Sequence, residues 1–131
     1  MPIECPYCKT SLEDHIACQC MDAWLAKSLG CNVLRETDTY HCVCSNRNHG
    51  TDSLFELYNY STDISAAMGV LPEILKKYDV EITLYQDGTH TIDIEFQDYD
   101  NYGLVVSCKG KGLNKLPLTI AKAVIAVMEK R

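Results

Sequence analysis

Alternation of apolar and polar residues in the second half of the chain predicts three β-strands. It covers residues 80–85, 91–96 and 102–108, and residues two apart in a strand share a face. The positions expected to face inward are Val80, Ile82, Leu84, Ile92, Ile94, Phe96, Tyr102, Leu104, Val106 and Cys108. Asp87-Gly88 lies between the first two segments and is a pair preferred in two-residue hairpins. We therefore predict an antiparallel meander.

Helical spacing of apolar residues predicts three helices, at residues 21–29, 61–78 and 117–130. Ser61 is expected to cap the start of the second helix. Pro72 interrupts the apolar stripe of that helix and should kink or split it, because proline lacks the N–H that the helix needs. The third helix, opened by Pro117, is apolar on almost every side. It is therefore a candidate for contact with a partner subunit.

The remaining segments are short and polar. Residues 32–53 are expected to form loops around a strand at residues 39–44, and residues 54–58 form a second short strand. The fold class is therefore predicted to be α+β, with the antiparallel meander packed between helices as an αβα sandwich. We divide the chain into a zinc-ribbon-like segment, residues 1–20, and an α+β domain, residues 21–131.

Length and charge restrict the classes of function. The chain has 131 residues, of which 47% are hydrophobic and 23% charged, which fits one compact domain. No apolar run approaches the ~20 residues of a membrane span, and the start has no pattern of a secretory signal. Eighteen acids against twelve bases give a net charge of −6, which disfavours general binding to nucleic acid. We expect a cytoplasmic protein.

Eight cysteines, seven of them in the first third of the chain, are the strongest chemical signal. Without an export signal, clustered thiols indicate metal ligands rather than disulfides. Cys5-Pro6-Tyr7-Cys8 places two thiolates two residues apart, as in zinc knuckles, and tetrahedral Zn²⁺ needs two such pairs. Our first interpretation completes the site with Cys18 and Cys20. Four thiolates would leave no open position, so the predicted zinc is structural.

Two other interpretations of the cysteines stay open. Cys42 and Cys44, in the predicted strand, could supply the second pair in place of Cys18 and Cys20. Alternatively there are two sites or none, with the remaining cysteines buried as small apolar side chains. A thioredoxin-like redox role is disfavoured, because only four residues precede Cys5 and that fold needs a strand there.

The sequence shows no catalytic constellation. It lacks a nucleophile elbow and a helical His-Glu-x-x-His pattern, and its four histidines, at positions 15, 41, 49 and 90, are scattered. Asp93 and Glu95 share one strand face, which is also usual for a half-exposed strand. The segment from Lys109 to Lys115, which contains Lys111, is interpreted first as a flexible connection. As an alternative, its lysines could bind a small phosphate-bearing ligand at the start of the last helix.

Three segments together resemble the phage ABA-sandwich domain, a family of small bacteriophage and prophage proteins. They are Asp22-Ala23-Trp24-Leu25-Ala26 with Leu29-Gly30, Tyr60-Ser61-Thr62-Asp63-Ile64-Ser65-Ala66-Ala67, and Leu116-Pro117-Leu118-Thr119-Ile120-Ala121-Lys122-Ala123. The resemblance covers about residues 21–130, outside the cysteine-rich start. It implies a sheet between helices and a phage protein acting in the bacterial host cytoplasm, and it brings no catalytic residues with it.

From the residues and the resemblance together, we expect a non-enzymatic accessory protein with structural zinc. Its expected partner is a host protein or a second copy of the chain, the latter through the last helix. The alternative is a protein that sequesters a nucleotide-type host signal through Lys109, Lys111 and Lys115.

Overall fold

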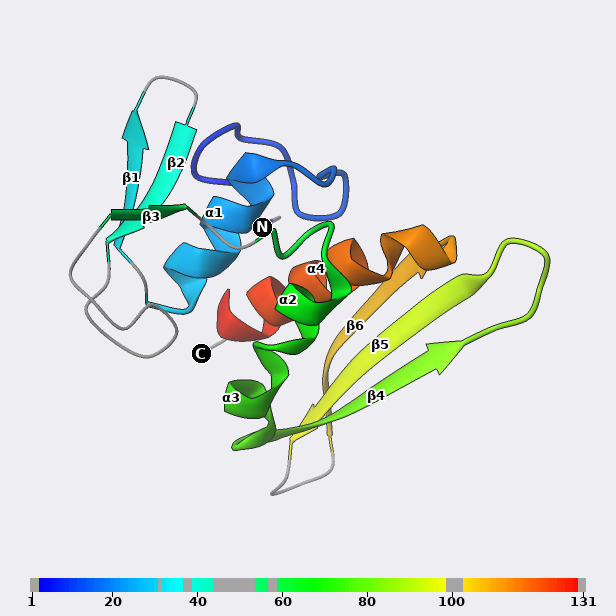
Figure 1. The fold of residues 1–131 in the computed structure, drawn as a ribbon. Coiled ribbons are helices and arrows are strands. Elements are labelled where there is room, and N and C mark those ends of the chain that lie inside the picture. Colours follow the sequence, from blue (N-terminus) through cyan, green and yellow to red (C-terminus); the bar gives the residue numbers. More distant parts are fainter. Residues whose placement is uncertain are drawn as a thin grey trace.

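The computed structural model describes residues 3–30, 32–36, 39–43, 54–56, 59–98 and 103–129. The chain is an α+β protein with two three-stranded antiparallel sheets (Figure 1). In chain order the elements are α1 (Gln19–Ser28), β1 (Asn32–Glu36), β2 (Thr39–Val43), β3 (Leu54–Glu56), α2 (Ile64–Met68), α3 (Leu71–Leu75), β4 (Tyr78–Leu84), β5 (Thr91–Asp98), β6 (Leu104–Lys111), a short 3₁₀ helix (Leu113–Lys115) and α4 (Leu116–Glu129). Within these ranges every helix is too short or too polar to cross a lipid bilayer.

The predicted meander is confirmed as the sheet β4-β5-β6. Its register places Ile82, Ile94 and Cys108 side by side on one face. β5 is central and alternates as expected, with Ile92, Ile94 and Phe96 buried against the helices. Leu84 and Leu104 were expected to face inward, but both are more than half exposed, because they lie at the ends of their strands.

The connection from β4 to β5 is longer than the predicted two-residue hairpin. The strands end at Leu84 and resume at Thr91, and the loop between them has positive φ at Gly88 and His90. Asp87 organises this loop, since its carboxylate accepts hydrogen bonds from the backbone N–H and the hydroxyl of both Thr89 and Thr91. Those bonds lower the pKa of Asp87. The Asp-Gly signal therefore identified the turn but not its length.

α4 lies at the centre of the molecule, between the meander and the other helices. It packs on β5 and β6 with one side and on α1 and α2 with the other. Nine of its fourteen residues are buried. The apolar character on almost every side, which suggested a partner subunit, is thus explained by burial within the chain's own fold.

Pro72 splits the predicted second helix, as expected, into α2 and α3. Ser61 does not cap it. The N-cap is Asp63, whose carboxylate accepts hydrogen bonds from the backbone N–H of Ser65 and Ala66. Two short helices cannot keep the single apolar stripe expected for one long helix. As a result Ile64 and Met68 in α2 are exposed, whereas Leu71 in α3 is buried.

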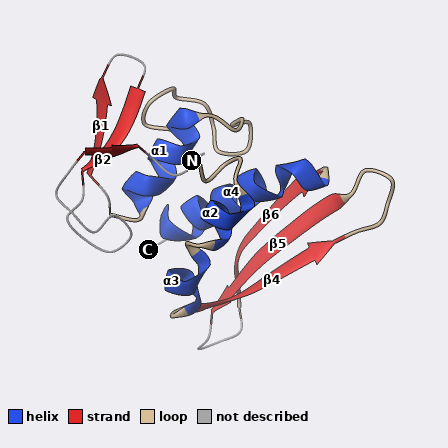
Figure 2. Ribbon diagram, in the orientation of Figure 1, coloured by secondary structure: helices blue, strands red, loops and turns tan. Residues whose placement is uncertain are grey.

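The small sheet β1-β2-β3 lies on the far side of the helices, against α1, so that the helices form a layer between two sheets (Figure 2). β2 and β3 match the expected strands at their first residues, Thr39 and Leu54. β1, at Asn32–Glu36, was predicted as loop, because its polar residues give no alternation. It pairs with β2 from Asn32 opposite Val43 to Glu36 opposite Thr39.

Candidate metal centre

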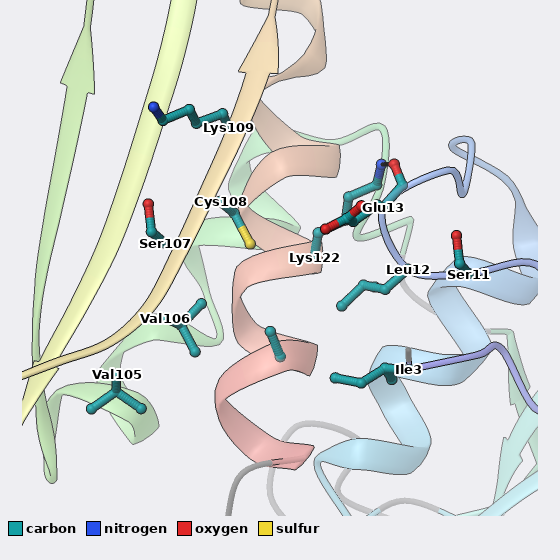
Figure 3. Close-up of a pocket in the computed structure, with 11 residues that line it drawn as sticks. Ile3, Ser11, Leu12, Glu13, Val105, Val106, Ser107, Cys108, Lys109 and Lys122 are labelled. Carbon is teal, nitrogen blue, oxygen red and sulfur yellow. Dashed lines mark hydrogen bonds between the residues drawn. The ribbon is translucent and has the colours of Figure 1, made fainter. Parts of the chain in front are cut away.

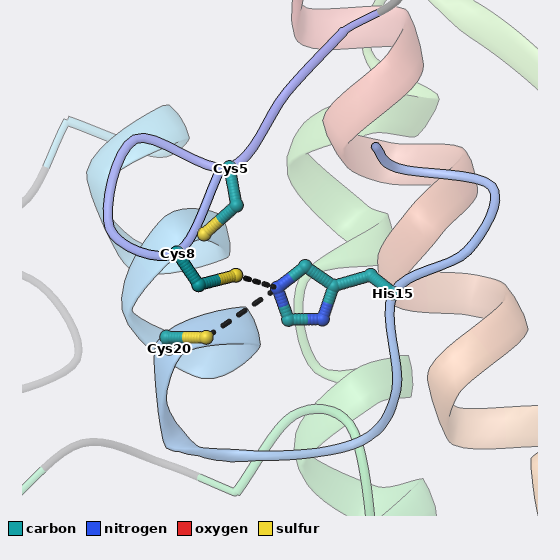
Figure 4. Close-up of side chains that lie close together, drawn as sticks. All are labelled: Cys5, Cys8, His15 and Cys20. Atoms are coloured by element: carbon teal, nitrogen blue, oxygen red, sulfur yellow. Dashed lines mark hydrogen bonds between the residues drawn. The ribbon is translucent and has the colours of Figure 1, made fainter. Parts of the chain in front are cut away.

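A tight turn near the N-terminus brings Cys5 and Cys8 together. The Cys5 N–H donates to the Thr10 carbonyl at 2.9 Å, and the Lys9 N–H donates to the Cys5 carbonyl at 3.0 Å. Lys9 has φ of 66°, in the left-handed region, which closes the turn. Both cysteine side chains project from it toward the start of α1 (Figure 4). The two-residue spacing thus places two thiols on one side, as the sequence predicted.

His15 faces the same space from a second turn. The Ser11 hydroxyl donates to the Asp14 carboxylate at 3.1 Å and accepts from the Asp14 N–H at 3.4 Å. The chain then directs the His15 ring inward, where it is only 3% exposed and lies 5.9 Å from the Trp24 ring, centroid to centroid. Because neutral imidazole is a common metal ligand, this histidine beside the thiols is a candidate ligand.

The hydrogen bonds of the His15 ring leave the correct nitrogen available for a cation. Nδ1 lies 2.8 Å from the Ile16 carbonyl, which can only accept, so Nδ1 carries the proton. Nε2 then has its lone pair directed at the thiols, 3.3 Å from Cys8 Sγ and 3.4 Å from Cys20 Sγ. Metal-binding histidines commonly hold their second nitrogen on a backbone carbonyl in this way, which fixes the tautomer and the ring orientation.

Cys5, Cys8, His15 and Cys20 sit close enough to hold one metal ion. Their ligand atoms, three sulfurs and one nitrogen, all lie within 4.8 Å of one another. Cys20 is in the first turn of α1, and Cys5 is fully buried. Three thiolates and one imidazole are a donor set that suits Zn²⁺, which prefers four such ligands.

The thiol pKa values show why a cation would fit here. Burial raises the pKa of Cys5, and burial together with the thiols of Cys18 and Cys8 raises that of Cys20. At Cys8 burial acts in the same direction, but hydrogen bonds, chiefly from Thr10, outweigh it and lower the pKa to about 6. Without a cation the cluster therefore favours one thiolate beside neutral thiols. A divalent cation reverses this, because it stabilises every coordinating thiolate.

The other cysteines predicted as metal ligands lie outside this group of four side chains or outside the described residues. Cys18 lies beside the group, with its Sγ 3.3 Å from Cys20 Sγ and 3.9 Å from His15 Nδ1, the nitrogen that faces away from the other thiols. Cys42 belongs to β2 by its backbone, and Cys44 lies outside the described residues. The alternative that uses this pair stays a prediction. His15 was not predicted as a ligand, although the spacing Cys-x₂-Cys-x₆-His-x₄-Cys contained the signal.

The predicted phosphate-binding segment is more ordered than a flexible connection. Lys109, Gly110 and Lys111 form the end of β6, opposite β5, and Lys115 ends the 3₁₀ helix. All three lysines are exposed. Gly110 is explained by packing, because a Cβ there would collide with the Thr119 hydroxyl of α4. Binding of an anion by these three lysines stays a prediction.

A separate cavity of about 730 Å³ lies between the N-terminal segment, β6 and α4 (Figure 3). Of the three predicted lysines only Lys109 lines it, and the Lys122 ammonium in it donates to the Glu13 carbonyl at 2.8 Å. Burial lowers the pKa of Lys122. Burial also raises the pKa of the Cys108 thiol to about 11. Cys108 therefore stays protonated at neutral pH, which makes it a poor nucleophile.

Comparisons with protein-family models, with curated proteins and with solved structures gave no match.

Proposed function

We propose that the chain is a non-enzymatic binding protein whose N-terminal segment is held in place by one structural Zn²⁺. The observation that carries this proposal is the convergence of Cys5, Cys8, His15 and Cys20 within 4.8 Å. The resemblance to phage ABA-sandwich proteins supports a bacterial host protein as the partner.

Zinc is favoured over other cations by the donor atoms. Thiolates are soft ligands, and Ca²⁺ and Mg²⁺ take oxygen donors, which this group lacks. Four protein ligands complete a tetrahedral shell and leave no position for water, so the ion would have a structural and not a catalytic role. Its contribution would be to stabilise a segment with little regular structure, since binding of a structural metal is generally coupled to folding.

A bound metal would fix the conformation of the N-terminal segment, which lies at the surface of the molecule. Cys20 ties it to α1, and the bond from Lys122 to the Glu13 carbonyl ties it to α4. Ile16, whose carbonyl orients His15, is 69% exposed, the highest value among the exposed large apolar side chains of the described residues. Because of this exposure, Ile16 is the position at which we test a protein contact of the N-terminal segment.

Native mass spectrometry of full-length protein purified without added metal tests the zinc site. We expect one zinc per chain, and its loss in the single variants Cys5→Ser, Cys8→Ser, His15→Ala and Cys20→Ser. Cys108→Ser is the matched control, because its thiol lies in the separate cavity and should keep the zinc. Wild-type protein without zinc would refute the proposal.

The binding role needs its own test. Zinc-loaded wild-type protein and an Ile16→Ser variant are immobilised and exposed to a bacterial lysate, and the retained proteins are compared. We expect a protein that the wild type retains and the variant loses. Identical sets of retained proteins on both would argue against the surface around Ile16 as the partner surface.

A further inference from the structure

We propose that Cys18 and Cys20 form a redox pair, whose oxidation to a disulfide removes Cys20 from the metal centre and releases the ion. The proposal rests on the proposed zinc site and extends it, because it assigns a function to a thiol that the metal does not need.

The geometry sets Cys18 apart from the other thiols. Its Sγ is 3.3 Å from the Sγ of Cys20, and the two residues are separated only by Gln19. The four ligands of the centre are complete without it, and its approach to His15 is on the Nδ1 side, which the Ile16 carbonyl occupies. Cys18 is therefore a spare thiol in contact with a ligand thiol.

The local backbone leaves Cys18 room to move toward its neighbour. Cys18 precedes α1 with an extended backbone, φ −165° and ψ 175°, and its side chain makes no capping hydrogen bond to the helix. Cys20 is already in the first turn of α1. Rotation about the Cys18 side-chain torsion can therefore change the sulfur–sulfur distance without unwinding a regular element.

The oxidant is a low-molecular-weight disulfide, RSSR, such as oxidised glutathione. The Cys18 sulfur attacks one sulfur of RSSR, so that a Cys18–SR bond forms, the RS–SR bond breaks, and the leaving thiolate takes the proton that Cys18 gives up. The Cys20 thiolate then attacks the Cys18 sulfur, and the second RS⁻ leaves and takes a proton from solvent. The two cysteines lose two electrons in total, and RSSR is reduced to two RSH.

The consequence for the metal follows from ligand chemistry. A disulfide sulfur carries no negative charge, so Cys20 no longer coordinates, and only Cys5, Cys8 and His15 remain. Zn²⁺ bound by three ligands in a segment with little other structure is held more weakly, and the chain releases it. Reduction of the disulfide by thiols restores the fourth ligand, which makes the change reversible.

Zinc release from the zinc-loaded full-length protein tests this inference. Oxidised glutathione is added, and the released zinc is measured with a chromogenic chelator. Mass spectrometry then gives the mass of the tryptic peptide of residues 10–27, in which Cys18 and Cys20 are the only cysteines. We expect zinc release together with the loss of two hydrogens from that peptide. Cys18→Ser should bind zinc normally but release it at least about tenfold more slowly, because it lacks the first attacking thiol. Cys108→Ser should behave as wild type.

Three results would overturn the inference. The first is a Cys18→Ser variant that releases zinc as fast as wild type, and the second is a disulfide that maps to Cys8 instead of Cys18. The third is a Cys18→Ser variant unable to bind zinc, which would make Cys18 a ligand. Failure of the proposed zinc site gives a different result, since the wild-type protein would then contain no zinc before any oxidant is added.

Discussion

The buried carboxylate of Asp22 in α1 accepts two hydrogen bonds from Ser61, one from its backbone N–H and one from its hydroxyl, both at 2.8 Å. Asp22 is 4% and Ser61 2% exposed, and 38 residues separate them in the sequence. The Ser61 hydroxyl also lies 3.5 Å from the Cys18 carbonyl. This contact attaches the segment before α2 to α1, directly beside the metal centre.

Ser61→Ala should destabilise the protein by about 1–3 kcal/mol, because a buried carboxylate loses one of its two hydrogen bonds. Chemical denaturation of the zinc-loaded protein measures this change. Ser65→Ala is the matched control, since Ser65 is exposed and its backbone N–H, which binds Asp63, is unaffected. Equal losses in the two variants would show that the Asp22 contact adds little stability.

Asp22 also predicts a dependence of stability on pH. Burial raises its pKa, and the two bonds from Ser61 oppose that shift without cancelling it. A carboxyl with a higher pKa in the folded state stabilises the fold below its unfolded pKa, about 3.9, and this contribution is lost as the pH rises through the folded value. Relative to wild type, Asp22→Asn should therefore become more stable as the pH rises from acidic to neutral. Urea unfolding at a series of pH values tests this, and a difference that is constant with pH would contradict it.

Much of the fold could be predicted from the periodicity of apolar residues, because a helix or strand that is buried on one face carries apolar side chains at regular intervals. The α+β class, the meander and the break at Pro72 are confirmed. β1 was missed because its sequence, Asn-Val-Leu-Arg-Glu, has two adjacent apolar residues and no alternation. The wrong N-cap arose because Ser61 and Asp63 are both good caps, and only the tertiary contact with Asp22 decides between them.

The group of side chains that forms the candidate metal centre was only partly predictable, because it depends on side-chain directions as well as on spacing. Cysteines at short spacing are visible in any sequence, and Cys5, Cys8 and Cys20 were identified in this way. His15 stands alone between Asp14 and Ile16, so its role depends on a turn that directs the ring inward. Side-chain direction brings His15 within 4.8 Å of these three cysteines, and the spacing of residues does not encode that direction.

Metal removal should loosen the N-terminal segment more than the rest of the molecule. In this segment the Cys5 and Leu12 amides bond to the Thr10 and Ile3 carbonyls, outside any helix or sheet. After chelation we expect these amides to lose protection in hydrogen exchange, while the buried amides of α4 keep most of theirs. Loss of protection to the same extent in both would mean that the metal stabilises the whole fold as one unit.

Thiol reactivity should separate Cys108 from Cys8 in the metal-free protein. Burial holds the pKa of Cys108 at about 11, whereas hydrogen bonds bring that of exposed Cys8 to about 6. Because the thiolate is the reactive form, Cys8 should be alkylated by iodoacetamide much faster near neutral pH. Peptide mass mapping over time measures both rates. Faster alkylation of Cys108 would mean that its cavity opens in solution.

Gly110→Ala should be destabilising, although alanine normally suits a strand better than glycine does. A Cβ at position 110 would occupy the space of the Thr119 hydroxyl. That hydroxyl donates to the Lys115 carbonyl at 2.8 Å. Thr119 belongs to α4, which packs on β6. Forcing the two elements apart should cost about 1–3 kcal/mol. In the Gly110→Ala/Thr119→Ala double variant the collision is gone, so its stability should exceed that of Gly110→Ala alone. A double-mutant cycle by denaturation measures the coupling, and strictly additive effects would show that the two residues do not meet.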